Sequence, residues 1–169
     1  MQDGFATSNA GFLEWANRLP MATSFGVKCV EVEFGRTVME VAEAPFLPNP
    51  NGAVHGGIVS AIIDHAMGVT LLSALPRRNA AVTASLTVNY LAPAVVPLVI
   101  ETRVTKSTRS LMFAESLVMS GDILVDQATG TFVPRTDFLL PHDEAPADVA
   151  FYAIEHPEVA RSGALSPRR

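Results

Sequence analysis

Polar and apolar residues alternate along much of this chain with the two-residue period of a half-buried β-strand. Near the N-terminus, Val30, Val32 and Phe34 are separated by glutamates. The pattern predicts strands over residues 25–34, 37–44, 81–91, 98–105, 111–119 and 123–133, the last of them interrupted near Gly130. The connections 106–110 and 120–122 are short enough for hairpins, so the strands that they join should pair antiparallel.

Two stretches have helical spacing instead. Residues 10–19 form an amphipathic pattern that Pro20 ends. Residues 57–75 are apolar on nearly every side, which predicts a long helix that is buried nearly all round. Residues 45–52 hold three prolines and two asparagines and read as a loop. One long apolar helix wrapped by a curved antiparallel sheet, with an extra helix at the N-terminus, is an α+β layout.

The strand predicted at 81–91 is long and rich in residues that favour β-structure. If this strand lies at an edge of the sheet, its unpaired backbone groups would invite another strand to pair with it. A homodimer that joins two sheets edge to edge would satisfy those groups.

Composition narrows the class of protein. The chain has 169 residues, and 49% of them are hydrophobic, which suits one main domain with a substantial core. The formal net charge of −5 argues against a nucleic-acid or anionic-membrane partner recognised through bulk charge. Cys29 is the only cysteine, so we expect neither disulfides nor a cysteine metal site. Because we find no leader pattern and no unbroken apolar span, we expect a cytoplasmic protein.

The two ends of the chain differ from its middle. We expect residues 1–24 to form a helical extension and residues 25–138 to form the main domain. Residues 139–169 are rich in proline, alanine and acidic side chains, so we expect a C-terminal extension that is partly disordered.

The candidate chemistry lies in the segment N-P-N-G-A-V-H-G-G-I-V-S-A-I-I-D, residues 49–64. A His-Gly-Gly at a helix start presents free backbone N–H groups to a ligand, and Asp64 is a carboxylate in an apolar helix. The alternative is that the glycines shape a turn and Asp64 is solvated. Nine helical positions place His55 and Asp64 about 13 Å apart on opposite faces. If both serve one site, they must come from two subunits.

The pattern N-x-x-x-x-x-H-G-G-x-x-x-x-x-x-D, followed by V-T-A-S-L-T-V-N-Y-L-A-P, resembles the hotdog-fold acyl-CoA thioesterases of the phenylacetate-degradation type, the group that includes thioesterase superfamily member 2. The resemblance covers residues 25–133. It implies a hotdog fold, hydrolysis of acyl-CoA thioesters, a homodimer as the minimal unit and a homotetramer as the assembly. It also implies that no cofactor is needed, since coenzyme A arrives as part of the substrate.

The same resemblance assigns roles to five residues. Asp64 would act as nucleophile or as general base on water, and both routes stay open. The backbone N–H of Gly56 would polarise the thioester carbonyl, and His55 would orient the thioester. Asn49 would help to place the water or the thioester, with Asn51 as the competing candidate, and Thr83 would hold the attacking water. Each has a simpler alternative: asparagines form turns and threonine favours strands.

Contacts to coenzyme A are a further expectation. Lys106 and Arg109 flank a hairpin turn and would meet the nucleotide phosphates, with Arg77 as a weaker candidate, although ordinary solvated loop charges explain them equally well. Gly57 would contribute backbone to the same ligand. Met67, Leu71 and Phe46 would line the acyl pocket. No metal site is expected, because no His/Cys/Asp cluster has ligand spacing.

Two other functions remain open at this point. A non-catalytic acyl-CoA-binding protein would have no use for Asp64 beside the carbonyl. A hotdog hydratase or dehydratase would need an Asp/His pair on a different motif, which this chain lacks.

Overall fold

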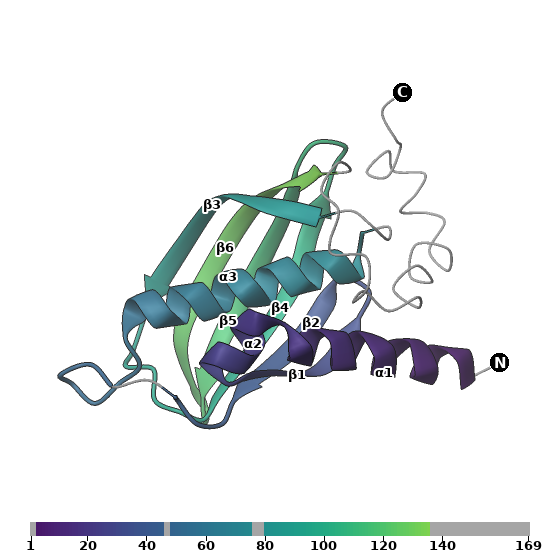
Figure 1. Ribbon diagram of the computed structural model, residues 1–169. Coiled ribbons are helices and arrows are strands. Elements are labelled where there is room, and N and C mark those ends of the chain that lie inside the picture. The colour runs from purple at the N-terminus through teal and green to yellow at the C-terminus, as the bar shows by residue number, and fades with distance from the viewer. Residues whose placement is uncertain (1–2, 46–47, 76–79, 136–169) are drawn as a thin grey trace.

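The computed structural model describes residues 3–45, 48–75 and 80–135, with side chains described from residue 10 onward (Figure 1). Its elements in chain order are α1 (Asp3–Arg18), α2 (Pro20–Phe25), β1 (Val27–Glu33), β2 (Arg36–Val41), α3 (Gly56–Ser73), β3 (Ala80–Tyr90), β4 (Leu98–Ser107), β5 (Met112–Ser120) and β6 (Ile123–Arg135). The expected C-terminal extension and Arg77 lie outside the described residues.

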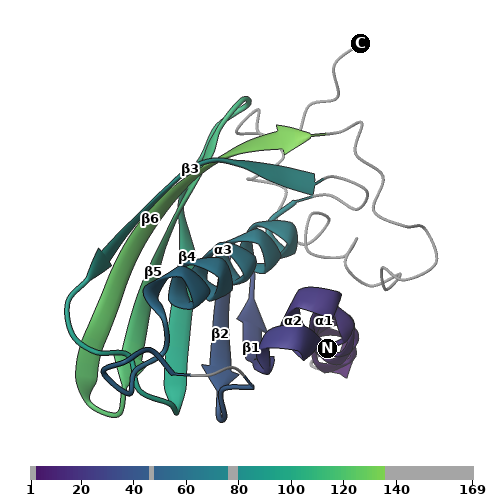
Figure 2. The ribbon, with the colours of Figure 1, turned by 60° about the vertical axis from the view of Figure 1, so that its left-hand side comes forward.

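The strands form one six-stranded antiparallel sheet with the order β1-β2-β4-β5-β6-β3. The sheet curves around α3, which lies across its concave face, and α1 and α2 lie beside β1 (Figures 1 and 2). The predicted α+β architecture, with a long helix wrapped by an antiparallel sheet and an extra N-terminal helix, is confirmed.

Helix α3 forms the centre of the core. Its residues Ile62, Ile63, Met67 and Leu71 have at most 1% of their surface exposed. By length and composition α3 is apolar enough to cross a membrane, but half of its residues are buried inside the fold. The apolar run is therefore explained by the sheet that wraps it, because a helix covered on most sides needs few polar positions.

The N-terminal helices differ from the prediction. Helix α1 begins at Asp3, well before residue 10, and a second short helix follows it. Pro20 ends the first helix as expected, but it also occupies the first turn of α2, where a missing N–H costs nothing. The Asn17 side chain accepts from the Cys29 N–H at 2.7 Å and donates to the Cys29 carbonyl at 3.0 Å, which joins α1 to β1.

Strand β6 also differs from the prediction, because it runs unbroken through Gly130. A Cβ atom at Gly130 would lie 2.5 Å from the Phe132 ring and 2.6 Å from the Met67 sulfur. The glycine is there because α3 approaches the sheet closely at this position, and it does not interrupt the strand.

The C-terminal end of α3 meets the β1–β2 turn through buried hydroxyl groups. Thr70 and Thr37 share a hydrogen bond of 2.6 Å, and Thr70 also donates to the Ala66 carbonyl. The Ser73 hydroxyl accepts from the Gly35 N–H at 2.9 Å and has the carbonyl oxygens of Thr70 and Glu33 within hydrogen-bond distance. Every hydroxyl in this cluster has a partner.

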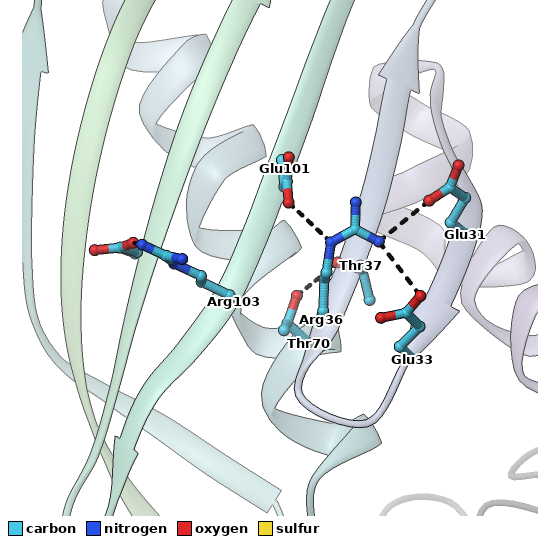
Figure 3. A network of polar contacts seen from close by, with 8 residues as sticks. Glu31, Glu33, Arg36, Thr37, Thr70, Glu101 and Arg103 are labelled. Atoms are coloured by element: carbon cyan, nitrogen blue, oxygen red, sulfur yellow. Dashed lines mark hydrogen bonds and ion pairs between the residues drawn. The ribbon is translucent and has the colours of Figure 1, made fainter.

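The outer face of the sheet carries ion pairs instead. Figure 3 shows Arg36 between Glu31, Glu33 and Glu101, while Thr37 and Thr70 lie on the other side of β2. Arg103 pairs with Glu115 on the next two strands. These pairs cross neighbouring strands, but solvent-exposed pairs of this kind contribute little to stability.

Within the described residues β3 is an edge strand, paired only with β6. The sequence favours edge-to-edge dimerisation if this strand lies at an edge of the sheet, and the structure places it there. Most of β3 is exposed, including Val82 at 46% and Tyr90 at 55%. The other edge, β1, has α1 and α2 packed beside it (Figure 2).

Candidate functional site

The loop before α3 is held by its own asparagine. The Asn49 side-chain oxygen accepts from the N–H groups of Asn51 and Ala53 at 2.9 and 3.1 Å. The Asn49 backbone N–H bonds to the Ala53 carbonyl. Asn49 is therefore a turn former here. Its amide nitrogen makes no hydrogen bond within the described part of the chain, so that group is available to a ligand.

The start of α3 leaves one N–H group open. His55 is the N-cap, and its Nδ1 atom accepts from the Gly57 N–H at 3.3 Å. The His55 carbonyl accepts from Ile58 and Val59. Among the residues that the structure describes, the Gly56 N–H has no hydrogen-bond partner. The first turn thus presents this group, with the positive end of the helix dipole behind it.

Gly56 is confined by Tyr90 at the end of β3. The Tyr90 hydroxyl donates to the Gly56 carbonyl at 3.0 Å and shares a short hydrogen bond with Ser60. A Cβ atom at Gly56 would lie 3.1 Å from Tyr90 Cε1, tighter than most contacts of that kind. A side chain at this position would therefore have to displace the Tyr90 ring by a few tenths of an ångström. In the sequence Tyr90 is marked only as a strand residue, because its partner is 34 residues away.

Asp64 is half-buried, and its carboxylate has one hydrogen-bond partner among the described residues. Thr83 Oγ1 donates to Asp64 Oδ1 at 2.8 Å, so α3 and the edge strand β3 meet at this pair. The structure thus brings Asp64 and Thr83 together in one chain, and it keeps His55 and Gly56 on a separate turn of the same helix. The arrangement leaves Asp64 Oδ2 and the lone pairs of the Thr83 hydroxyl to receive a water.

His65 projects from the next helix position. Burial lowers the pKa of His65, and the neighbouring Asp64 carboxylate partly opposes that shift. A half-buried histidine with a lowered pKa stays neutral at pH 7, which suits a wall of the site better than a charged ligand contact.

The basic residues lie elsewhere. Lys106 and Arg109 are exposed, at the end of β4 and in the β4–β5 hairpin. Val104 bonds to the Gly35 carbonyl, and Gly35 bonds to Ser73 at the C-terminal end of α3. In one chain these cations are therefore at the opposite end of α3 from Gly56.

A pocket of about 220 Å³ lies beside the helix start. Gly56, Asn49, Tyr90 and Asp126 line it, together with Asn51 and small apolar residues. Burial raises the pKa of Asp126 to about 6. Asp126 has no signal in the sequence, because it follows an apolar run in a predicted strand and has no motif around it.

The apolar residues expected to line an acyl pocket are placed differently. Met67 and Leu71 have no exposed surface and belong to the core between α3 and the sheet. Their expected role as pocket walls is not compatible with that burial. Phe46 lies outside the described residues. No group of three or more metal-ligating side chains is found in the described ranges.

Comparisons with known proteins agree with this fold and segment. The sequence model of the thioesterase superfamily matches residues 51–126. A protein of Halobacterium salinarum, named as a candidate esterase, is 36% identical over 96 residues; the match covers 55% of this chain and 64% of that protein. The chain therefore matches somewhat less than two thirds of that relative's length.

Two solved structures share the architecture. One, from Ralstonia eutropha, is described as a candidate thioesterase related to phenylacetic acid degradation; it is 24% identical with a TM-score of 0.65, over 72% of this chain and 98% of that one. The other, from Streptococcus mutans with acetyl-CoA bound, is 23% identical with a TM-score of 0.59, over 64% and 88%. The expected resemblance to hotdog-fold thioesterases is confirmed: the superfamily's sequence model matches residues 51–126, and the solved structures share the fold.

Proposed function

We propose that this chain, with its thioesterase-superfamily segment over residues 51–126, hydrolyses acyl-CoA thioesters to the free acid and coenzyme A. One observation carries the proposal most directly: the Thr83 hydroxyl is bonded to Asp64, while the Gly56 N–H is left open on a separate turn of the same helix. Acetyl-CoA bound to the Streptococcus mutans structure supports coenzyme A esters as the substrate class.

The chemistry needs two parts that the chain supplies separately. The thioester oxygen accepts from the Gly56 N–H, and the helix dipole favours the negative charge that develops on this oxygen during attack. Asp64 either removes a proton from a water held by Thr83 or attacks the carbonyl carbon itself, giving a mixed anhydride that water then opens. In both routes the carbon–sulfur bond breaks and a thiolate leaves, which needs no strong general acid.

The site is completed by a second subunit. Gly56 and Asp64 are eight positions apart on α3, so they lie about 12 Å apart along the helix axis and cannot act on one carbonyl. Pairing of the exposed edge strand β3 with its copy would bring Asp64 and Thr83 of one subunit toward Gly56 and His55 of the other. We propose a homodimer of this kind as the minimal unit and a homotetramer as the assembly.

The other residues that the sequence suggests, Asn49, His55, Lys106 and Arg109, would bind or orient the substrate. The Asn49 amide nitrogen is free to donate to the thioester or the water, and His55 shapes the helix start through its bond to Gly57. Lys106 and Arg109 are far from Gly56 of their own chain, so they would contact the phosphates of coenzyme A bound at the other site of the dimer. The enzyme would work in the cytoplasm without a separate cofactor.

The test is a thiol-release assay against coenzyme A esters of short, medium, long and aryl acyl groups. Wild type, Asp64→Asn and Asp122→Asn would be compared, since Asp122 is an exposed carboxylate in the β5–β6 turn. We expect hydrolysis by wild type and Asp122→Asn, and loss of it in Asp64→Asn. Binding of the esters without release by wild type would favour a non-catalytic acyl-CoA-binding protein.

A further inference from the structure

Asp126 is a buried carboxylate without a partner. Only 1% of the residue is exposed, and neither carboxylate oxygen has a hydrogen bond within the described residues. Leaving an ionised group in this state costs several kcal/mol, and such groups normally have a partner. A bound group that supplies the missing hydrogen bond would account for its presence.

The sheet register directs Asp126 toward the helix side. It has the same parity along β6 as Ala128 and Phe132, which are buried under α3. Val125 is the extra residue of a bulge in β6, opposite Val118 and Met119 of β5, and it is buried next to Asp126. Asp126 is therefore held inside by the ordinary alternation of β6, and the bulge turns Val125 inward beside it.

The pocket beside Asp126 contains no compensating charge. Its lining includes Asp126, two asparagines, Tyr90 and small apolar residues, but no lysine, arginine or histidine. The Tyr90 hydroxyl is directed to Ser60 and the Gly56 carbonyl instead of Asp126. At about 220 Å³ the pocket is smaller than sites that enclose a whole drug-sized ligand, so it suits one end of a larger molecule.

We infer that this pocket is a subsite for an acyl group that ends in a hydrogen-bond donor, with Asp126 as the acceptor. The inference rests on the proposed function, because Gly56 lines the same pocket and would hold the thioester carbonyl of that acyl group. An ammonium satisfies a buried carboxylate better than a hydroxyl does, and a methyl group does not satisfy it. The expected order of preference is therefore amino, hydroxyl, methyl.

The experiment uses coenzyme A esters that differ only in the terminal group. One set is butyryl, 3-hydroxypropionyl and 3-aminopropionyl; a longer set is heptanoyl, 6-hydroxyhexanoyl and 6-aminohexanoyl. For wild type we expect kcat/KM for the amino ester to exceed that of the methyl ester by about 10- to 100-fold at one of the two lengths. Asp126→Leu should remove or invert this preference, and the isosteric Asp126→Asn should lose the amino preference while keeping part of the hydroxyl preference.

Asp122→Asn is the matched control and should keep the wild-type ratios. The subsite would be overturned if wild type hydrolysed the methyl esters as well as or better than the others at both lengths. It would also be overturned if the preference for donor-ended esters survived in Asp126→Leu. Either result would leave the thioesterase proposal intact. If no ester is hydrolysed, equilibrium binding of the corresponding thioethers of coenzyme A tests the subsite independently of catalysis. Tighter binding of the donor-ended thioethers supports the subsite without catalysis, and equal binding overturns it.

Discussion

The two ends of helix α3 treat polar groups in opposite ways. At the C-terminal end, the hydroxyls of Thr70 and Ser73 are buried and every one has a partner in β1, β2 or the helix itself. At the N-terminal end, the Gly56 N–H is open and the nearby Asp126 carboxylate is buried without a partner. Groups that satisfy one another stabilise the fold, whereas groups that remain unsatisfied are those that a ligand can use. The difference supports our proposal of a site at the helix start.

The largest effect tests the division of the site between subunits. Asp64→Asn should lower the thiol-release rate by about 10²- to 10⁴-fold, the usual contribution of a positioned acid or base, with an unchanged unfolding midpoint. Mixing these subunits with Gly56→Ala subunits, by unfolding and refolding together, should restore part of the activity in mixed dimers. Activity that never exceeds that of the separate variants, in oligomers shown to be mixed, would argue for a site within one chain.

A second effect concerns the helix start alone. Gly56→Ala should lower kcat by about 10²- to 10³-fold, as removal of one oxyanion donor does, because the added methyl group meets the Tyr90 ring and displaces the N–H. Gly68→Ala is the control, since a Cβ atom there has no neighbour within 4 Å. It should leave kcat unchanged and raise stability slightly, by under about 1 kcal/mol. A normal rate in Gly56→Ala would remove the oxyanion role.

A third effect is the pH dependence of stability caused by Asp126. Its folded-state pKa is raised to about 6 from 3.8, so the folded protein binds the proton more tightly than the unfolded chain does. Wild type should therefore gain stability relative to Asp126→Asn as the pH falls from 8 to 4, by about 2 kcal/mol. Urea unfolding of both proteins at several pH values measures this difference. A pH-independent difference would show that Asp126 has an ordinary pKa.

The smallest effect belongs to the opposite end of α3. Ser73→Ala leaves the buried Gly35 N–H without its acceptor and should cost about 1–2 kcal/mol of stability. The thiol-release rate at a temperature well below the unfolding midpoint should stay within about twofold of wild type. A large loss of activity in the folded variant would mean that the two ends of the helix are coupled, and the contrast between them would fail.

Much of the fold can be predicted from the sequence, because burial of one side of a strand requires apolar residues at every second position. The parity of Met39 and Val41 in β2, and of Leu98 and Ile100 in β4, matches their burial. The apolar run of α3 likewise identifies the central helix. Gly130 wrongly predicts an interruption, because a glycine required by close packing looks the same in sequence as one that breaks a strand.

The site is less visible in the sequence than the fold. The His-Gly-Gly start and Asp64 stand out, since a polar group in an apolar helix has a local signature. The contact between Tyr90 and Gly56 joins residues 34 apart, and the bulge that turns Val125 inward beside Asp126 depends on how β6 pairs with β5. Such features arise from strand register and from the placement of distant elements, which a local pattern of residues does not specify.

The walls of the pocket beside Gly56 are joined by main-chain bonds. The carbonyl of Val125, the extra residue of the bulge, accepts from the N–H groups of Leu91 and Ala92, and the Ala94 carbonyl accepts from Val54. None of these bonds depends on which side chain is present. Point mutations at the small lining residues can therefore change what the pocket accepts while its frame is inherited unaltered. Proteins with this architecture can therefore change substrate specificity through single substitutions while the backbone of the pocket stays the same.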